Sequence, residues 1–203
     1  MTRHRVLVVD DHAAVRSGLT ALLSDEVDLR PVGSAASARE ALELAQRLTP
    51  DVAVVDFQLG DRDGLTLCRQ LKELPHPTRV LLYSAYADGP LALAAVIAGA
   101  DGVVHKAALA EDLCRAIRTV ASGGGAVPAI SPASHAMVAE CLEAEDLPIL
   151  AMLVAGTEPD DIAEVLGVQP EWLTARRWAM VERLRRVSGR RVPASAARDG
   201  VRA

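Results

Sequence analysis

Val6-Leu7-Val8-Val9-Asp10-Asp11 is the stretch that decides the fold, because four apolar residues run directly into two carboxylates. Three later stretches repeat the design: residues 52–55 before Asp56, residues 80–83 before Ser84, and residues 102–105 before Lys106. Short continuous apolar runs separated by helical patterns are typical of buried parallel strands. Residues 6–122 are therefore predicted to form an α/β fold, a doubly wound sheet of five parallel strands with a helix after each strand.

The polar residues at the strand ends point to phosphate chemistry. Ligands bind at the carboxyl ends of the strands in an open parallel sheet, so these side chains are expected to lie at one edge. Mg²⁺ prefers carboxylate oxygens, and Asp11 and Asp56 could ligate it directly, with Asp10 acting through water. An ionised Asp56 can attack phosphorus to give an acyl phosphate. Ser84 could hydrogen-bond a phosphoryl oxygen, and Lys106 could offset its charge.

A structural role is the competing interpretation of each carboxylate. A single Asp after a strand is commonly a helix cap or a turn residue. The ordered set of strand ends argues against that interpretation, since every position carries a residue that suits the same chemistry. The lysine adds to this argument, because Lys72 and Lys106 are the only lysines among 22 basic residues.

Four motifs resemble the receiver domain of two-component response regulators over about residues 1–122: VLVVDDH at 6–12, VAVVD at 52–56, LLYSA at 81–85 and GADGVVHKA at 99–107. The resemblance implies a flavodoxin-like fold in which Asp56 accepts a phosphoryl group from a sensor histidine kinase. It implies that Asp10, Asp11, Asp56 and the backbone carbonyl of Gln58 hold Mg²⁺. Ser84 and Lys106 would sense the phosphoryl group.

The chain departs from this family at Val103. The family usually has Tyr or Phe three residues before the lysine, where the ring rotates inward on phosphorylation, and this chain has Val103 there. A valine has no comparable lever. Any signal is therefore expected to travel through Ser84 and the segment that follows it.

Composition fits a cytoplasmic regulator. The chain has 203 residues, which suggests one to two domains, and a net charge of −5, which gives no general reason to expect nucleic acid as a partner. Its three cysteines are widely spaced and are expected to be reduced thiols. The basic start is followed by too short an apolar run for a signal peptide, and no run approaches the ~20 residues that a membrane span needs. No membrane partner is expected.

Residues 123–141 are predicted to be a linker, in part helical from residue 135 to residue 142, because three glycines follow Ser122. Residues 142–187 then show helical patterns that begin at Asp146, Pro159 and Pro170, with Gly167 at the turn. This order is the helix-turn-helix plan. The segments at 149–156 and 161–168 resemble the LuxR-type helix-turn-helix of the NarL/FixJ regulators, which implies that this small all-α domain binds promoter DNA.

Candidate DNA contacts follow from the last helix, and they are Thr174, Arg176, Arg177, Arg183, Arg185 and Arg186. Three features weaken the resemblance. Residues 143–146 are acidic where the family's first helix opens with a Thr-Pro-Arg-Glu-like stretch, Trp172 stands where the family has Thr, and the predicted groove face is poor in basic residues. Residues 188–203 contain Gly and Pro and are predicted to be a disordered tail without the family's apolar dimer helix. A homodimer, or a heterodimer with another regulator, stays open.

The sequence thus predicts a phosphorylation-controlled transcriptional regulator and not a turnover enzyme. Phosphorylation of Asp56 would shift an existing equilibrium between arrangements of the two domains, and the helix-turn-helix would bind a promoter. The alternative is an interaction protein whose helical domain binds a protein partner. A phosphatase of the haloacid-dehalogenase type is a third possibility, but it needs a second Asp where this chain has Gln58.

Overall fold

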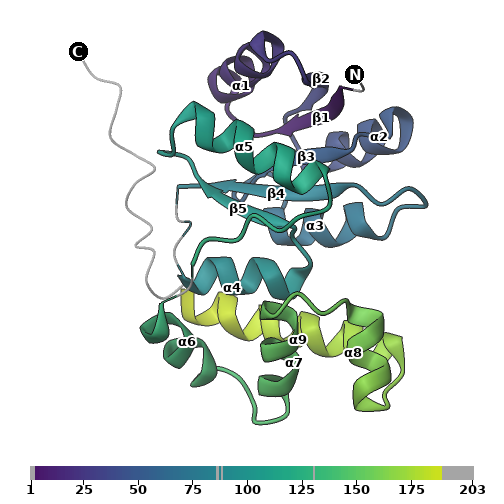
Figure 1. Cartoon of the computed structure of the whole chain (residues 1–203), viewed down its shortest axis with the longest axis vertical. Coiled ribbons are helices and arrows are strands. Elements are labelled where there is room, and N and C mark those ends of the chain that lie inside the picture. Colours follow the sequence, from purple (N-terminus) through teal and green to yellow (C-terminus); the bar gives the residue numbers. More distant parts are fainter. Residues whose placement is uncertain (1–2, 86, 88, 130, 189–203) are drawn as a thin grey trace.

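The computed structural model describes residues 3–85, 87, 89–129 and 131–188 (Figure 1). A five-stranded parallel sheet with the order β2-β1-β3-β4-β5 forms its centre. The strands are β1 (His4–Val9), β2 (Leu29–Ala35), β3 (Val52–Asp56), β4 (Arg79–Ser84) and β5 (Gly102–His105). The predicted doubly wound α/β fold is thereby confirmed.

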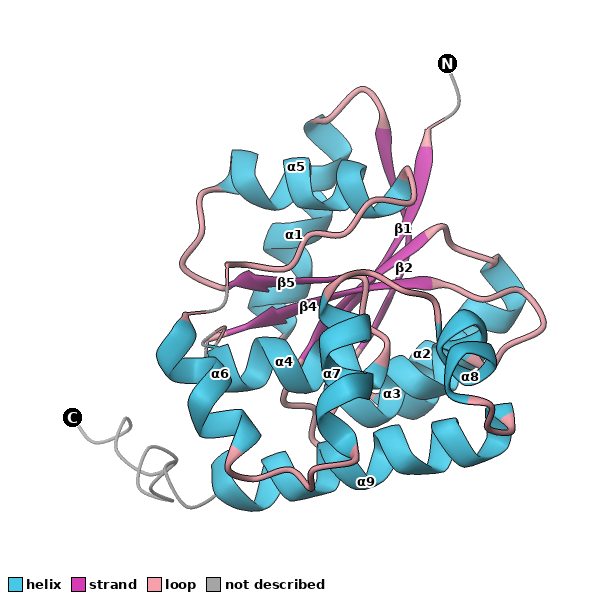
Figure 2. Cartoon of the chain, turned by 60° about the horizontal axis from the view of Figure 1, so that its bottom comes forward, coloured by secondary structure: helices cyan, strands magenta, loops and turns pink. Residues whose placement is uncertain are grey.

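Helices cover both faces of the sheet (Figures 1 and 2). One face packs against α1 (Ala13–Asp25) and α5 (Ala110–Ala121), and the other against α2 (Ala38–Leu48), α3 (Gly64–Lys72) and α4 (Gly89–Ala98). Alternate residues of β1 supply the two cores: Val6 and Val8 pack on the α1–α5 side, Leu7 and Val9 on the other. Because both faces of such a strand are buried, its residues do not alternate between apolar and polar, which explains the continuous apolar runs.

Strand β2 lies at one edge of the sheet and has no apolar run of its own, since only Leu29 and Ala35 at its two ends are buried. Its pairing with β1 shifts register between Val6, opposite Pro31, and Leu7, opposite Gly33. Proline cannot donate a ladder hydrogen bond and is tolerated at edges and bulges, so Pro31 fits this position. Edge strands that are only partly buried carry a weak sequence pattern, and the predicted runs accordingly located the other four strands only.

Four helices follow α5: α6 (Pro132–Ala139), α7 (Asp146–Val154), α8 (Pro159–Leu166) and α9 (Pro170–Ser188). The predicted starts of α7, α8 and α9 agree with the structure, and Gly167 ends α8 with a φ of 65°. The short helix expected at residues 135–142 begins three residues earlier, because Ser131 caps it and Pro132 occupies its first position. The tail predicted to be disordered lies outside the described residues from 189 onward.

The segment after α5 returns to the sheet before these helices begin. Val103 donates a backbone hydrogen bond to the Ala126 carbonyl at 2.9 Å, and Ala126 donates one to the Asp101 carbonyl at 2.9 Å. Residues near Ala126 therefore run beside β5 and cover part of its outer edge. The first part of the predicted linker is held by these bonds.

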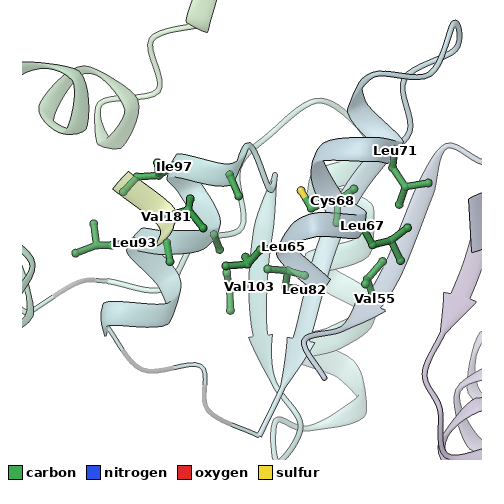
Figure 3. Packing of buried hydrophobic residues seen from close by; sticks show 14 of the residues in the cluster. Val55, Leu65, Leu67, Cys68, Leu71, Leu82, Leu93, Ile97, Val103 and Val181 are labelled. Atoms are coloured by element: carbon green, nitrogen blue, oxygen red, sulfur yellow. The ribbon is translucent and has the colours of Figure 1, made fainter. Parts of the chain in front are cut away.

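Helix α9 lies along α4 on the side away from the sheet (Figures 1 and 2). The α4 sequence GPLALAAVIA has no polar side chain, and seven of its residues are buried. A helix that is apolar all round needs cover on every side. The sheet covers one side of α4 and α9 the other, with Val181 of α9 beside Leu93 and Ile97 (Figure 3). One continuous core thus joins the α/β unit to the C-terminal helices.

The start of α3 is packed tightly against the end of β3. A Cβ added to Gly64 would lie 2.5 Å from the Asp56 carbonyl oxygen and 2.9 Å from the Phe57 Cα. We predict that Gly64→Ala lowers the free energy of unfolding by about 1–3 kcal/mol, because the backbone of Asp56 must move to make room. Denaturant unfolding followed by circular dichroism measures the change.

Gly18 is the matched control for this variant. It lies on the exposed side of α1, where a Cβ would meet nothing within 4 Å. Gly18→Ala is therefore expected to raise the free energy of unfolding by roughly 0.5–1 kcal/mol, since alanine favours the helix. Equal effects of the two substitutions would contradict the close approach at Gly64.

Candidate functional site

The carboxyl ends of four strands meet at one edge of the sheet, as the sequence predicts. Asp10 follows β1, Asp56 ends β3, Ser84 ends β4 and Lys106 follows β5. The Lys106 Nζ lies 2.7 Å from Asp10 Oδ2 and 2.7 Å from Asp56 Oδ2. Two carboxylates from different strands therefore share one ammonium group from a third.

The acidic side chains of the site continue from buried Asp10, after β1, to the exposed residue Asp11. Ligand atoms of Asp10, Asp11, His12 and Asp56 all lie within 4.8 Å of one another. Asp10 and Asp56 are buried, whereas Asp11 and His12 are exposed. Three carboxylates face one ammonium here, and this excess of negative oxygen donors suits a hard divalent cation.

His12 is a site residue that the sequence reasoning did not single out. Its Nδ1 lies 2.7 Å from Asp11 Oδ1, and its backbone N–H donates to Asp10 Oδ1 at 2.8 Å. The backbone bond fixes the Asp10 carboxylate at the start of α1. The place of His12 directly after the acidic pair is the signal that could have identified it.

A compact loop follows Asp56 and is closed by its own backbone. The Gln58 N–H donates to Asp56 Oδ1 at 3.2 Å, Leu59 N–H to the Arg62 carbonyl at 3.2 Å, and Gly64 N–H to the Phe57 carbonyl at 2.7 Å. The loop places Gln58 beside the Asp56 carboxylate. The role of the Gln58 carbonyl as a metal ligand stays a prediction.

Burial and charge oppose each other at the site. Burial raises the pKa of the Asp56 carboxyl above its ordinary value, and the hydrogen bond and charge of Lys106 only partly offset that effect. For Lys106, burial acts to lower the pKa, but its hydrogen bonds to Asp10 and Asp56 raise it overall. The lysine is thus held in its charged form, and it favours the ionised form of Asp56.

Ser84 and Lys106 are aligned by the backbone of adjacent strands. Ser84 is 2% exposed, and its carbonyl accepts the backbone N–H of Lys106 at 2.8 Å. Tyr83, which was not predicted as a site residue, donates its hydroxyl to the Lys106 carbonyl at 3.2 Å. Val103 is buried in the core on the α4 side of the sheet and does not reach this edge.

Two of the predicted DNA contacts pair with the acidic opening of the C-terminal helices. Arg176 Nε donates to Asp146 Oδ1 at 2.5 Å, and Arg183 Nη1 donates to Asp146 Oδ2 at 2.7 Å. Both guanidinium groups also donate to the Glu143 carboxylate. Asp146 is fully buried, so this cluster is part of the packing between α7 and α9.

Two further arginines of α9 face the α/β unit. Arg177 Nε donates to the Ile97 carbonyl of α4 at 2.9 Å, and Arg185 donates to the Asp63 carboxylate at the start of α3. Thr174 is exposed at the rim of a cleft of about 600 Å³ between α4, α7 and α9, and Arg186 is exposed. Among the described residues, neither Thr174 nor Arg186 has a hydrogen-bond or ion-pair partner. Four of the six predicted DNA contacts are therefore engaged within the chain.

None of the described helices combines the length and the apolar character that crossing a membrane requires.

Known proteins show the same architecture. Residues 6–118 match the family model described as the response regulator receiver domain. Response regulator GacA of Pseudomonas aeruginosa is 28% identical over 207 positions that cover 97% of each chain. The DNA-binding transcriptional activator DevR/DosR of Mycobacterium tuberculosis is 40% identical over 119 residues, which is 59% of this chain and only 55% of that relative.

A solved structure extends the likeness to the fold. A two-component response regulator of the LuxR family from Aurantimonas sp. SI85-9A1 superposes with a TM-score of 0.59 and 32% identity, covering 68% of this chain and 97% of that one. The matched family model spans more than half of the sequence, and it includes every strand end of the site. The chain therefore belongs to the response regulator family and has the NarL/FixJ-type combination of a receiver domain and C-terminal helices.

Proposed function

We propose that this chain is a phosphorylation-controlled transcriptional regulator of the bacterial cytoplasm, with Asp56 as its phospho-acceptor. The observation that carries the proposal is the position of the Asp56 carboxylate, 2.7 Å from the Lys106 ammonium and within 4.8 Å of the ligand atoms of Asp10 and Asp11. A sensor histidine kinase is the proposed phosphodonor and promoter DNA the proposed target. Support for the target comes from DevR/DosR, the relative that is a DNA-binding transcriptional activator.

The proposed reaction transfers a phosphoryl group from a phosphohistidine to Asp56. A carboxylate oxygen of Asp56 attacks the phosphorus of a phosphohistidine, the phosphorus–nitrogen bond breaks, and the electron pair leaves with the imidazole. The product is an acyl phosphate on Asp56. Lys106 offsets the charge of the transferred group, and the Ser84 hydroxyl donates to one of its oxygens.

The donor set fits a magnesium ion. Asp10, Asp11, Asp56 and the backbone carbonyl of Gln58 would hold it, and it would supply positive charge for the phosphoryl oxygens. Because Asp10 and Asp56 are buried beside a single ammonium group, a divalent cation also relieves their mutual repulsion. The phosphoryl group stays on the chain as a signal, so no turnover is proposed.

The proposed domain organisation follows the sequence boundaries. Residues 1–122 form the receiver, 123–141 the linker, 142–187 the helix-turn-helix and 188–203 the tail. Thr174, Arg176, Arg177, Arg183, Arg185 and Arg186 are the proposed DNA contacts. With four of them engaged within the chain, DNA binding requires a rearrangement of α9, which phosphorylation would favour. Dimerisation with itself or with another regulator is an additional proposal.

A second candidate function is favoured by the charge of the C-terminal helices. Residues 119–175 contain no lysine or arginine. Five exposed carboxylates lie on α8 and the residues beside it, with no ion-pair partner in the described part of the chain: Glu158, Asp160, Asp161, Glu164 and Glu171. Val165 is 71% exposed and Trp172 43% exposed on the same elements. Such a surface repels phosphates and suits a basic, apolar protein partner.

The acceptor assignment predicts the effect of Asp56→Asn. This variant should form no acid-stable, base-labile acyl phosphate when it is incubated with acetyl phosphate and magnesium, because an amide oxygen is a poor nucleophile. Its circular dichroism spectrum should match the parent. Asp160→Asn, an exposed carboxylate on α8, serves as the control and should be phosphorylated normally. Stoichiometric phosphate in the Asp56→Asn protein would refute the assignment.

Lys106 is expected to set both the rate and the pH dependence of phosphorylation. Lys106→Met removes the group that lowers the pKa of Asp56, so the acidic limb of the rate profile should move to higher pH. The rate at neutral pH should fall by about tenfold or more, because the phosphoryl charge loses its partner.

The control for this substitution is Lys72→Met, since Lys72 is the other lysine and pairs with Asp101 at 2.6 Å, at the amino ends of β4 and β5 and away from the site. Rates with a small phosphodonor, measured from pH 4 to pH 8 for both variants, decide the matter. A profile that is the same for Lys106→Met and the parent would contradict the role of Lys106.

The acidic surface separates the two candidate functions. If α8 and α9 approach DNA, then Asp161→Asn with Glu164→Gln should tighten DNA binding by roughly tenfold or more, since two charges that repel phosphates are lost. Fluorescence anisotropy over a salt series measures the affinity. Asp25→Asn with Glu111→Gln makes the same charge change on α1 and α5 and should have little effect. Affinity that is equally weak in both proteins would favour the protein-partner function.

A further inference from the structure

Asp63 connects the phospho-acceptor loop to the first turn of α3. It lies seven residues after Asp56, and its carboxylate caps α3 by accepting the Thr66 N–H at 3.0 Å and the Thr66 hydroxyl at 2.9 Å. An Asp at this position is a common helix cap and needs no other explanation. In this chain the same carboxylate has an additional partner from α9.

That partner is Arg185, which lies 122 residues further along the chain. Its Nη2 donates to Asp63 Oδ1 and, at 3.2 Å, to the Thr66 hydroxyl. The guanidinium carbon of Arg185 lies 4.9 Å from the centroid of the Trp178 ring, and that of Arg69, on α3, lies 4.7 Å from it. Trp178 of α9 is therefore in contact with one cation from each side of the interface.

The loop between Asp56 and Asp63 leaves little room for independent movement. Gln58 donates to the Asp56 carboxylate and also forms a β-bridge with Asp63. Gly64 packs against the backbone of Asp56 with no space for a side chain. A group attached at Asp56 Oδ1 would occupy the atom that accepts the Gln58 N–H, and the displacement would then reach Asp63 through one bridge.

The family's aromatic route is not available to this chain. Val103 is 3% exposed and packed in the core that includes Leu93 and Ile97, so it has no long side chain to reorient. The contact between Asp63 and Arg185 instead joins the acceptor loop directly to the helix that carries the proposed DNA contacts.

We propose that the phosphorylation state of Asp56 is transmitted to α9 through the 57–63 loop and the Asp63–Arg185 ion pair. The pair holds α9 against α3 in the unphosphorylated chain, and phosphorylation weakens it and releases Arg185 from α3, leaving its ion pair with Glu182 on α9. This inference rests on the proposed role of Asp56. Coupling between two sites is reciprocal, so loss of the ion pair should in turn favour the phosphorylated form.

The fluorescence of Trp178 can report on the contact between α9 and α3. Both tryptophans lie on α9, and Trp172→Phe leaves Trp178 as the only tryptophan in the chain. In this background, titration with beryllofluoride and Mg²⁺ as a phosphoryl analogue should shift the emission of Trp178. Addition of Asp63→Asn keeps a side chain that can cap α3 but removes the charge that binds Arg185. Before beryllofluoride is added, Trp178 of this Trp172→Phe, Asp63→Asn protein should already emit near the shifted value, and titration should change its emission little. The protein should bind beryllofluoride several-fold more tightly than the Trp172→Phe parent does.

Arg47→Gln is the matched control, because Arg47 is an exposed helical arginine on α2 and has no ion pair with a described residue. It should respond like the Trp172→Phe parent, whereas Arg185→Gln should bind beryllofluoride as tightly as Asp63→Asn does. The double variant Asp63→Asn with Arg185→Gln should bind beryllofluoride no more tightly than either single variant, since both substitutions break the same Asp63–Arg185 contact.

Two results would overturn the inference, and they are distinguishable. A Trp178 response and a beryllofluoride affinity that are the same in Asp63→Asn and the parent would refute the route while leaving Asp56 as the acceptor. Failure of every variant to bind beryllofluoride or to form an acyl phosphate would instead refute the proposed function, and the inference with it.

Discussion

The parallel pairing of the strands is the constraint on which the rest of the molecule depends. Because β1, β3, β4 and β5 run in one direction, their carboxyl ends share one edge, and each end contributes at least one polar side chain to the site. Lys106 then bridges Asp10 and Asp56 across that edge. The apolar runs that stabilise the sheet are thus the same segments that position the side chains of the site.

Several arginines of α9 form ion pairs within the chain that contribute to the packing of the helices. Arg176 and Arg183 neutralise Asp146, a carboxylate with no exposed surface, and Arg185 joins α9 to α3. Removal of one partner from such a buried cluster leaves an uncompensated charge, which costs far more than an exposed ion pair contributes. Any nucleic acid that binds these arginines must therefore compete with carboxylates that already hold them.

The sequence predicts where the strand-end residues lie, but it does not predict the partners of the α9 arginines, for a physical reason. The positions of Asp10, Asp56, Ser84 and Lys106 follow from strand direction alone, which local patterns reveal. The partners of Arg176 and Arg183 depend on how α7 packs against α9, and no short-range pattern encodes that arrangement. Sequence also marks the apolar character of α4, but it does not name α9 as the element that covers it.

The shared core has a practical consequence for work on parts of this chain. A fragment that ends near residue 122, where the receiver is predicted to end, would leave the outer side of α4 without α9. Leu93, Ile97 and their neighbours would then face water as one apolar strip. Such a truncated receiver would tend to self-associate through that strip, and its oligomeric state would reflect the cut rather than the native protein.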